Sequence, residues 1–191
     1  NVERAAAGGA WGALTTTGQS CTSVERCYGQ RSIYEPLRQA LVREVAYEQI
    51  PRSERASRHQ TVAEWIESLG RIEDHAEMLA YHWSSALELV RASGAVDDEL
   101  SERTRLALRA AGDRAMALNN FPVAAAQYVE ALQLWPPDSD ERPELMFRRA
   151  RALYHAYDEE QREAALEEAR DALLAAGDTD RAAEAERPRE L

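Results

Sequence analysis

Two histidines on one predicted helix are the first residues whose types and spacing could serve chemistry. His75 and His82 lie seven residues apart, on one helix face, with Glu77 nearby. Imidazole nitrogens and carboxylate oxygens are common ligands of zinc and other transition metals. The same spacing is typical of half-buried polar residues on a packing face, and we favour that interpretation. The sequence therefore predicts no metal site.

Neighbouring acids form a second group of candidates. Glu159-Glu160 and Glu167-Glu168 offer the paired carboxylates that general acid–base catalysis uses. Catalysis needs environments that separate the two carboxylates into an acid and a base. A solvated helix provides no such difference, so we do not expect these pairs to be catalytic.

Other catalytic residue types are scarce. Cys21 and Cys27 lie in a polar segment at a spacing that fits neither a zinc nor a redox motif. All 23 basic residues are arginine, which excludes a Schiff-base lysine or a phosphate-loop lysine. H-E-x-x-H and G-x-S-x-G motifs are also missing from the sequence. We predict that the chain is not an enzyme and binds no cofactor.

The composition and net charge of the chain indicate which kinds of partner and localisation to expect. The 191 residues are 45% hydrophobic and 30% charged, as in globular proteins, and the net charge is −11 with a pI of about 4.9. Such an acidic chain repels a phosphate backbone, so we expect no direct contact with nucleic acid. The sequence has neither a signal-peptide pattern nor an apolar run of the roughly 20 residues that span a bilayer. We predict a cytoplasmic protein with no membrane contact.

The elements that position these residues are predicted to be helices throughout. Apolar residues recur at spacings of three and four, and alanine, the best helix former, is abundant. Trp65, Trp83 and Trp135 occupy packing positions and are expected in the core, as are Met78 and Leu118. Residues 1–35 are predicted to be irregular. The helices are expected at residues 36–50, 53–69, 73–92, 99–119 and 142–157, at a segment ending near 135, around 165–172 and at 178–187.

The stretch from Arg105 to Asp138 combines small residues at helix contacts with large apolar residues between them. It resembles a tetratricopeptide repeat, although Ala111 and Ala115 are smaller than that pattern favours. The resemblance implies an all-α fold, with antiparallel helix pairs stacked as a right-handed superhelix over residues 36–191. The residues that carry the signature are Leu108, Gly112, Ala124, Tyr128, Ala131 and Pro136.

A second resemblance covers the segment from Leu37 to Tyr47, L-R-Q-A-L-V-R-E-V-A-Y. It is similar to a segment of bacterial multidomain signalling ATPases, including adenylate/guanylate cyclase–ATPase–repeat proteins and LuxR-type regulators. Gln39 stands where that motif has histidine. The resemblance implies that residues 1–35 are the edge of a preceding winged-helix-like domain.

These resemblances imply a non-catalytic interaction and sensor scaffold within a signalling ATPase, possessing no enzymatic activity of its own. The alternative is a free-standing adaptor that binds peptides in its concave groove, and a helical enzyme is the least favoured class. The expected partner is a protein, a peptide or a neighbouring ATPase domain. Candidate groove residues are Arg105, Arg109, Arg114, Asn119, Arg148, Arg149 and Arg151, with His155 beside them.

Overall fold

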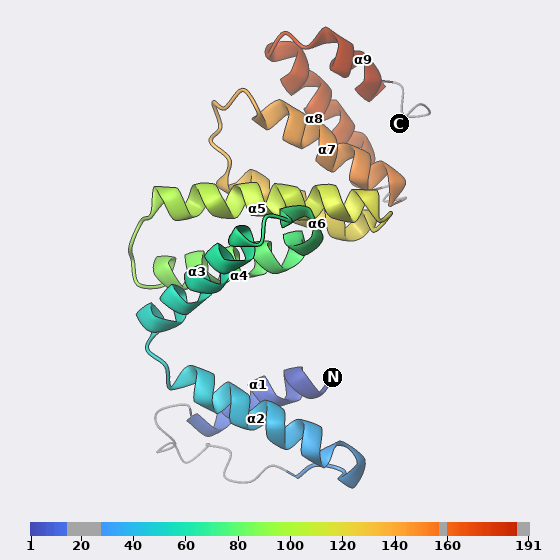
Figure 1. The fold of residues 1–191 in the computed structure, drawn as a ribbon. Helices are drawn as coiled ribbons and strands as arrows, with labels where there is room; N and C mark the ends of the chain where they lie inside the picture. The colour runs from blue at the N-terminus through green and yellow to red at the C-terminus, as the bar shows by residue number, and fades with distance from the viewer. Residues whose placement is uncertain (15–27, 157–159, 187–191) are drawn as a thin grey trace. The chain divides into compact units, whose positions relative to one another are not determined.

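The computed structural model describes residues 1–14, 28–156 and 160–186. Within these ranges all regular secondary structure is helical, and no strand is present (Figure 1). The prediction of an all-α fold is therefore confirmed. The right-handed superhelical arrangement stays a prediction.

The chain divides into two compact units, Asn1–Arg55 and Ala56–Leu191. This division lies about 20 residues beyond the boundary expected near residue 35, inside a continuous helix. The helix, α3, spans Arg52–Ser68 and carries its first residues in unit 1 and the remainder in unit 2. The predicted boundary relied on a change in sequence pattern, whereas the division follows the packing of the helices.

Unit 1 is a small helical assembly. Its elements are α1 (Val2–Leu14), the short 3₁₀ helix η2 (Arg31–Ile33) and α2 (Tyr34–Glu48). Ala6 of α1 packs against Leu37 and Ala40 of α2 in a core of its own. The expectation that residues 1–35 are irregular is wrong for Val2–Leu14, because tertiary packing on α2 offsets the helix-weakening effect of its glycines.

Unit 2 continues from α3 through seven further helical elements among the described residues. Pro122 and Pro143 lie in the first turns of α6 and α7, where a missing N–H costs nothing. Gly94 and Gly177 have positive φ values of 81° and 83° just after α4 and α8, as helix-ending residues commonly do. The elements are η3 (Ile72–His75), α4 (Ala76–Arg91), α5 (Asp98–Ala117), α6 (Phe121–Leu134), α7 (Arg142–His155), α8 (Arg162–Ala175) and α9 (Thr179–Glu186).

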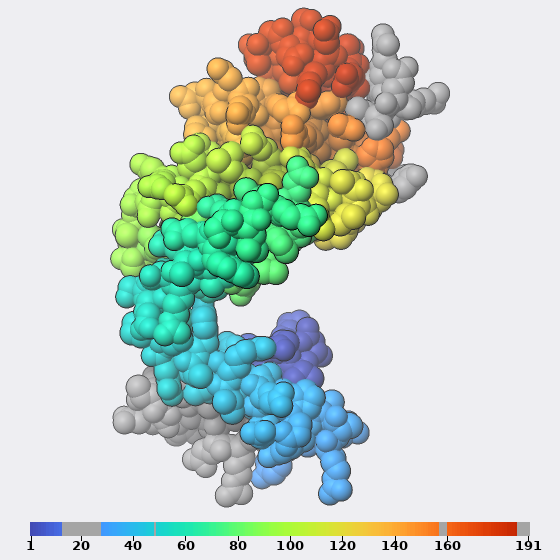
Figure 2. Space-filling view, viewed as in Figure 1, coloured from blue at the N-terminus to red at the C-terminus, as the bar shows by residue number. Residues whose placement is uncertain are grey.

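The helices of unit 2 from α4 onward pack mainly against their neighbours in the sequence, from α4 on α5 to α8 on α9. The colours of this unit accordingly follow one another in bands from green to red in Figure 2. One continuous core runs through the unit, and its largest fully buried side chains include Trp83, Tyr128 and Phe147. The tryptophans expected in the core are buried at positions 83 and 135.

Three predicted core residues are instead exposed: Trp65, Met78 and Leu118. Trp65 directly precedes the buried Ile66, and about 100° of rotation per helical residue turns it away from the core. The same step separates exposed Met78 from buried Leu79, and Leu118 lies beyond the last turn of α5. Within the described residues, no helix is both long and apolar enough to cross a membrane.

Candidate functional site

The α5–α6 contact positions the most structured polar site of unit 2. Gly112 of α5 lies directly under the ring of Tyr128 of α6, since a Cβ at Gly112 would stand only 2.5 Å from the Tyr128 Cε1 atom. This close approach buries Tyr128 almost completely while its hydroxyl reaches Asp113, the residue after Gly112. The glycine and the aromatic residue of the repeat-like signature therefore place a polar group at the edge of the core.

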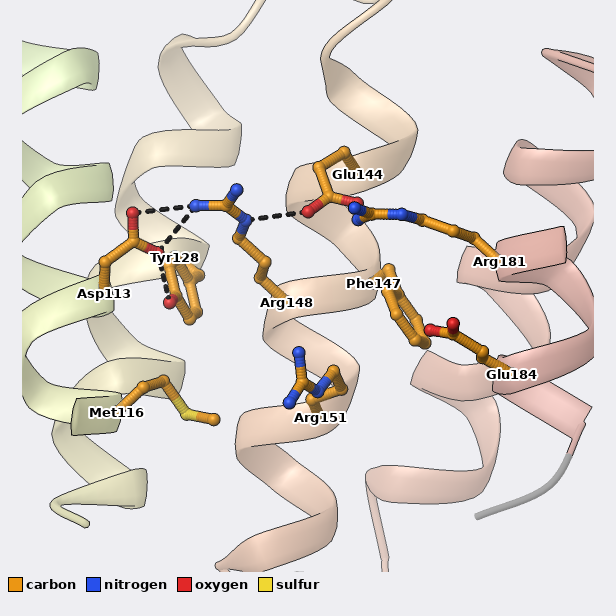
Figure 3. Close-up of a pocket in the computed structure, with 9 residues that line it drawn as sticks. All are labelled: Asp113, Met116, Tyr128, Glu144, Phe147, Arg148, Arg151, Arg181 and Glu184. Atoms are coloured by element: carbon orange, nitrogen blue, oxygen red, sulfur yellow. Dashed lines mark hydrogen bonds and ion pairs between the residues drawn. The ribbon is translucent and has the colours of Figure 1, made fainter. Parts of the chain in front are cut away.

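A pocket of about 370 Å³ opens beside this hydroxyl, between α5, α6, α7 and α9 (Figure 3). We call it the Tyr128 pocket. Its walls carry three arginines and three acids, so their formal charges cancel. The lining residues are Asp113, Met116, Tyr128, Glu144, Phe147, Arg148, Arg151, Arg181 and Glu184.

A chain of ion pairs crosses one side of the pocket. The Tyr128 hydroxyl donates a hydrogen bond of 2.8 Å to Asp113 Oδ1, and Arg148 donates to both Asp113 oxygens at 2.7 and 2.8 Å. Arg148 also donates through Nε to Glu144 at 2.9 Å, and Glu144 pairs with Arg181 of α9. This network links α5, α6, α7 and α9 through half-buried charges, for which hydrogen-bonded ion pairs are a common solution.

Tyr128 is an uncharged donor in this network. Burial raises the pKa of its phenol well above the ordinary value, and the hydrogen bond to Asp113 raises it further. The arginines at positions 148 and 151 act in the opposite direction but do not overcome these effects. Tyr128 thus holds its proton at neutral pH and cannot serve as a general base there.

Arg151 differs from Arg148, which lies three residues earlier on α7. Its guanidinium stands 5.9 Å from the centre of the Phe147 ring, and it has no hydrogen bond or ion pair to a described residue. Its Nε atom is buried and unpartnered. Figure 3 shows the side chain pointing into the pocket below Arg148. Arg151 is therefore the cation of this pocket that is left available.

A second pocket shares Arg148, Glu144 and Arg181 with the Tyr128 pocket and carries one more acid than it has arginines. Arg109, Arg148 and Arg181 are among its lining residues, together with four carboxylates. Arg109 pairs with Glu141 at 3.1 Å and stands 5.2 Å from the Trp135 ring centre. The carboxylates are those of Asp140, Glu141, Glu144 and Asp178.

The other candidate groove residues are dispersed. Arg105 stands 5.4 Å from the Trp135 ring centre, and Arg114 donates to the Glu73 carbonyl, joining α5 to η3. Arg149 pairs with Glu168 of α8 at 3.3 Å. Asn119 lies in the turn after α5 with a φ of 58°, a conformation that asparagine tolerates better than most residues. Of the predicted set, the Tyr128 pocket brings together Arg148 and Arg151.

The repeat-signature residues lie at helix contacts or at a helix end. Leu108, Ala124 and Ala131 are buried in the core, as is Tyr128, while Pro136 follows the end of α6. Their positions describe how α5 and α6 pack, and none of them lines the pocket except Tyr128.

Sequence reasoning missed an imidazole pair between α3 and α4. The Nδ1 atoms of His59 and His82 are 2.9 Å apart, so one ring donates a hydrogen bond to the other. Burial lowers the pKa of His82. The two histidines are 23 residues apart in the sequence, so their spacing does not predict a contact. Only the packing of α3 on α4 brings the two rings together. His75, the predicted neighbour of His82, is not part of this pair.

The candidate groups that lie within the described ranges form no metal site. Among the described residues, no three histidine, cysteine, aspartate or glutamate side chains gather closely enough to hold a metal ion. Cys21, Cys27 and Glu159 lie outside the described residues. Glu167 and Glu168 lie on α8, where Glu168 pairs with Arg149.

Comparison with known proteins gives one finding of similarity. The model of the aldehyde dehydrogenase family matches residues 1–81, less than half of the chain. The chain matches no curated protein and no solved structure. The matched range includes unit 1, α3, η3 and the beginning of α4.

This match overturns the identification with signalling ATPases, cyclase-linked proteins and LuxR-type regulators. The segment from Leu37 to Tyr47, which carried that resemblance, lies inside the range matched by the dehydrogenase family. The predictions of a non-catalytic repeat scaffold and of a chain that is not an enzyme are wrong for the same reason, since the matching family is one of oxidoreductases. Small residues spaced for close helix contact describe packing, and packing is shared by proteins of many functions.

Proposed function

We propose that the chain is part of an aldehyde-oxidising enzyme, with residues 1–81 as the segment related to the aldehyde dehydrogenase family. The observation that carries this proposal is the family match over that range. The reaction class is oxidation of an aldehyde to a carboxylic acid. We place the enzyme in the cytoplasm.

The matched segment contains both thiols of the chain. A thiolate is the strongest nucleophile that protein side chains offer toward a carbonyl carbon, and Cys21 and Cys27 are the residues that could supply one. An alternative Schiff-base route through lysine does not exist in a chain without lysine. The two cysteines are therefore the first residues to test.

A dehydrogenase also needs a hydride acceptor, commonly a nicotinamide dinucleotide. Such dinucleotides usually bind at the ends of parallel strands, over a glycine-rich turn. The described residues contain no strand, and the sequence contains no G-x-G-x-x-G. The described residues therefore do not fit this cofactor.

The direct test follows the step that needs no hydride acceptor, which is the addition of a cysteine thiol across the aldehyde C=O bond to give a thiohemiacetal. A series of aliphatic and aromatic aldehydes labelled with ¹³C at the carbonyl is added to the purified chain, and the adduct is detected by NMR. We expect the adduct to be lost in Cys21→Ser or Cys27→Ser, while the other serine variant keeps it and serves as the matched control. A folded chain that forms no adduct with any aldehyde would contradict the proposal for this chain, and an adduct that survives in the double serine variant would remove the thiols from it.

We also propose that unit 2 binds a protein or peptide partner. The specific observation in favour is the available guanidinium of Arg151 inside an open, polar pocket. An arginine in such a position suits a carboxylate of the partner. A binding screen of unit 2 against short acidic and neutral peptides tests this, and equal, non-saturating signals for both sets would contradict it.

A further inference from the structure

The acids of the Tyr128 pocket are already engaged, and this determines what a ligand would meet. Asp113 and Glu144 together accept from Arg148, and Glu144 also pairs with Arg181. These two acids and two arginines form a neutral chain. What remains in the lining is the cation of Arg151 and the acid of Glu184, which are not ion-paired to any described residue.

Arg151 is held in place without using its hydrogen-bonding capacity. It lies one helical turn after Phe147, and its guanidinium approaches that ring, so packing limits its freedom. A guanidinium carries five N–H donors, and buried donors without partners are rare because each costs free energy. A ligand acceptor at its terminal nitrogens would make use of this capacity.

The charge of the lining selects among anions. Asp113 and Glu144 are neutralised by Arg148 and Arg181, so the available charges are one cation, Arg151, and one acid, Glu184. A phosphate dianion would bring two negative charges against the single cation of Arg151 and would also be repelled by Glu184. A monoanionic carboxylate needs only one available cation and matches the planar fork of an arginine in two parallel hydrogen bonds. The observations therefore favour a carboxylate over a phosphate.

The remaining wall is apolar. Met116 of α5 is half-buried and lies on the pocket lining near Arg151 in Figure 3, with the Phe147 ring on the opposite side. A methionine side chain adapts its shape to an apolar group placed against it. A ligand with an apolar substituent next to its carboxylate would thus contact both the charged and the apolar parts of the pocket.

We infer that the Tyr128 pocket is a binding site for a carboxylate that bears an apolar substituent, with Arg151 as its bidentate donor and Met116 as its apolar contact. The inference rests on the partner binding proposed for unit 2. Two sources supply this chemistry: the C-terminal carboxylate of a protein, or a free carboxylic acid, which is also the product class of aldehyde oxidation.

The test uses the whole chain and two pairs of probes. One pair is an acetylated peptide ending in Ala-Leu with a free carboxylate, and the same peptide with an amidated end. The other pair is hexanoate and hexanamide. Binding is followed by calorimetry and by the NMR signal of the Arg151 Nε–H group, which requires no substitution.

We expect both acids to bind, both amides to fail, and the Arg151 Nε–H signal to shift on titration with the acids. Arg151→Gln is expected to weaken acid binding about tenfold or more, because a charge-assisted hydrogen-bonded pair is lost. Arg151→Lys should recover part of it. Arg162→Gln is the matched control, since Arg162 lies on α8 and does not line the pocket.

The outcomes distinguish a failure of the carboxylate site at Arg151 from a failure of the partner binding proposed for unit 2. Tighter binding of the peptide than of hexanoate assigns the site to a protein terminus, and binding of hexanoate alone keeps the site but removes the peptide partner. Acidic peptides that bind equally well to Arg151→Gln would overturn the inference and leave partner binding elsewhere on unit 2. Equal binding of acids and amides, or no saturable binding of either acid, would also overturn it.

Discussion

Single residues decide how closely the helices of unit 2 approach one another. Gly112 is the clearest case, because its missing side chain is the space that the Tyr128 ring occupies. The hydroxyl of that ring then reaches Asp113 and the Arg148 network. A small residue in a helix contact thus determines the position of a polar site.

We predict that Gly112→Ala destabilises unit 2 by about 1–3 kcal/mol, because the added methyl overlaps a buried ring that has no room to retreat. Thermal unfolding followed by circular dichroism measures this. Gly8→Ala is the control, since a Cβ at Gly8 meets nothing within 4 Å. For Gly8→Ala we expect the free energy of unfolding of unit 1 to rise by about 0.5–1 kcal/mol, because alanine favours a helix more than glycine does. An unchanged melt for Gly112→Ala would show that the α5–α6 contact is looser than described.

Asp97 illustrates a second residue-scale effect at the start of α5. Its side chain accepts a hydrogen bond from the Leu100 N–H at 2.8 Å, which caps the helix. Asp97→Ala should cost about 1 kcal/mol of unfolding free energy, measured by chemical denaturation. Asp98→Ala, one residue further on, removes an acid from the same turn without removing the cap and should cost less. Equal losses would mean that charge rather than capping stabilises this end.

At the scale of elements, the existence and approximate ends of the helices could be predicted from apolar spacing, proline and glycine. The predicted helix at 53–69 is α3 at Arg52–Ser68, and that at 142–157 is α7 at Arg142–His155. Which face each helix buries was harder, as the exposed Trp65 and Met78 show. The spacing marks an apolar stripe but does not say which neighbour covers each edge of it.

The candidate site was predictable only in part for the same reason. Arg148 and Arg151 lie on one helix and could be named from their spacing. Asp113 and Arg181 belong to α5 and α9, and only the packing of four helices brings them to the same pocket. The His59–His82 pair escaped prediction because it depends on the way α3 lies on α4.

That imidazole pair predicts a pH dependence for the α3–α4 contact. Burial lowers the pKa of His82 in the folded state, so protonation favours the unfolded chain. The stabilisation is fully present above the unfolded value of about 6.5 and is lost as the pH falls through the lowered folded value. We expect the melting temperature of unit 2 to drop as the pH is lowered from 7 to 5, and His82→Gln to flatten that drop. His75→Gln, outside the pair, should leave it unchanged, and a drop that persists in His82→Gln would assign it to other groups.

At the scale of the whole molecule, the family match and the packing divide the chain differently. The match ends at residue 81, within α4, whereas the compact units meet at Arg55 and Ala56. The two cores share no residue. Similarity in sequence therefore extends across a structural boundary, and the related segment includes part of the unit that carries the Tyr128 pocket.

Because unit 1 and unit 2 have separate hydrophobic cores, we predict that a core substitution in one unit lowers the free energy of unfolding of that unit alone. Leu37→Ala removes a large side chain from the core of unit 1 and should destabilise that unit by about 2–4 kcal/mol. The unfolding of unit 2 should keep its midpoint. Hydrogen exchange read residue by residue distinguishes the two, and equal loss of protection in α5 and α2 would show that the units unfold together. Leu106→Ala, at a partly exposed position of α5, controls for a leucine lost outside a core.

The neighbour-to-neighbour packing from α4 to α9 also bears on how unit 2 would respond to tension. No extensive contact joins the first of these helices to the last, so pulling on the C-terminal end loads the α8–α9 contact before the others. The helices would then detach one after another, and the extension trace would show several small steps in place of one large rupture. The Arg181–Glu144 ion pair ties α9 back to α7 and would be among the first connections to break.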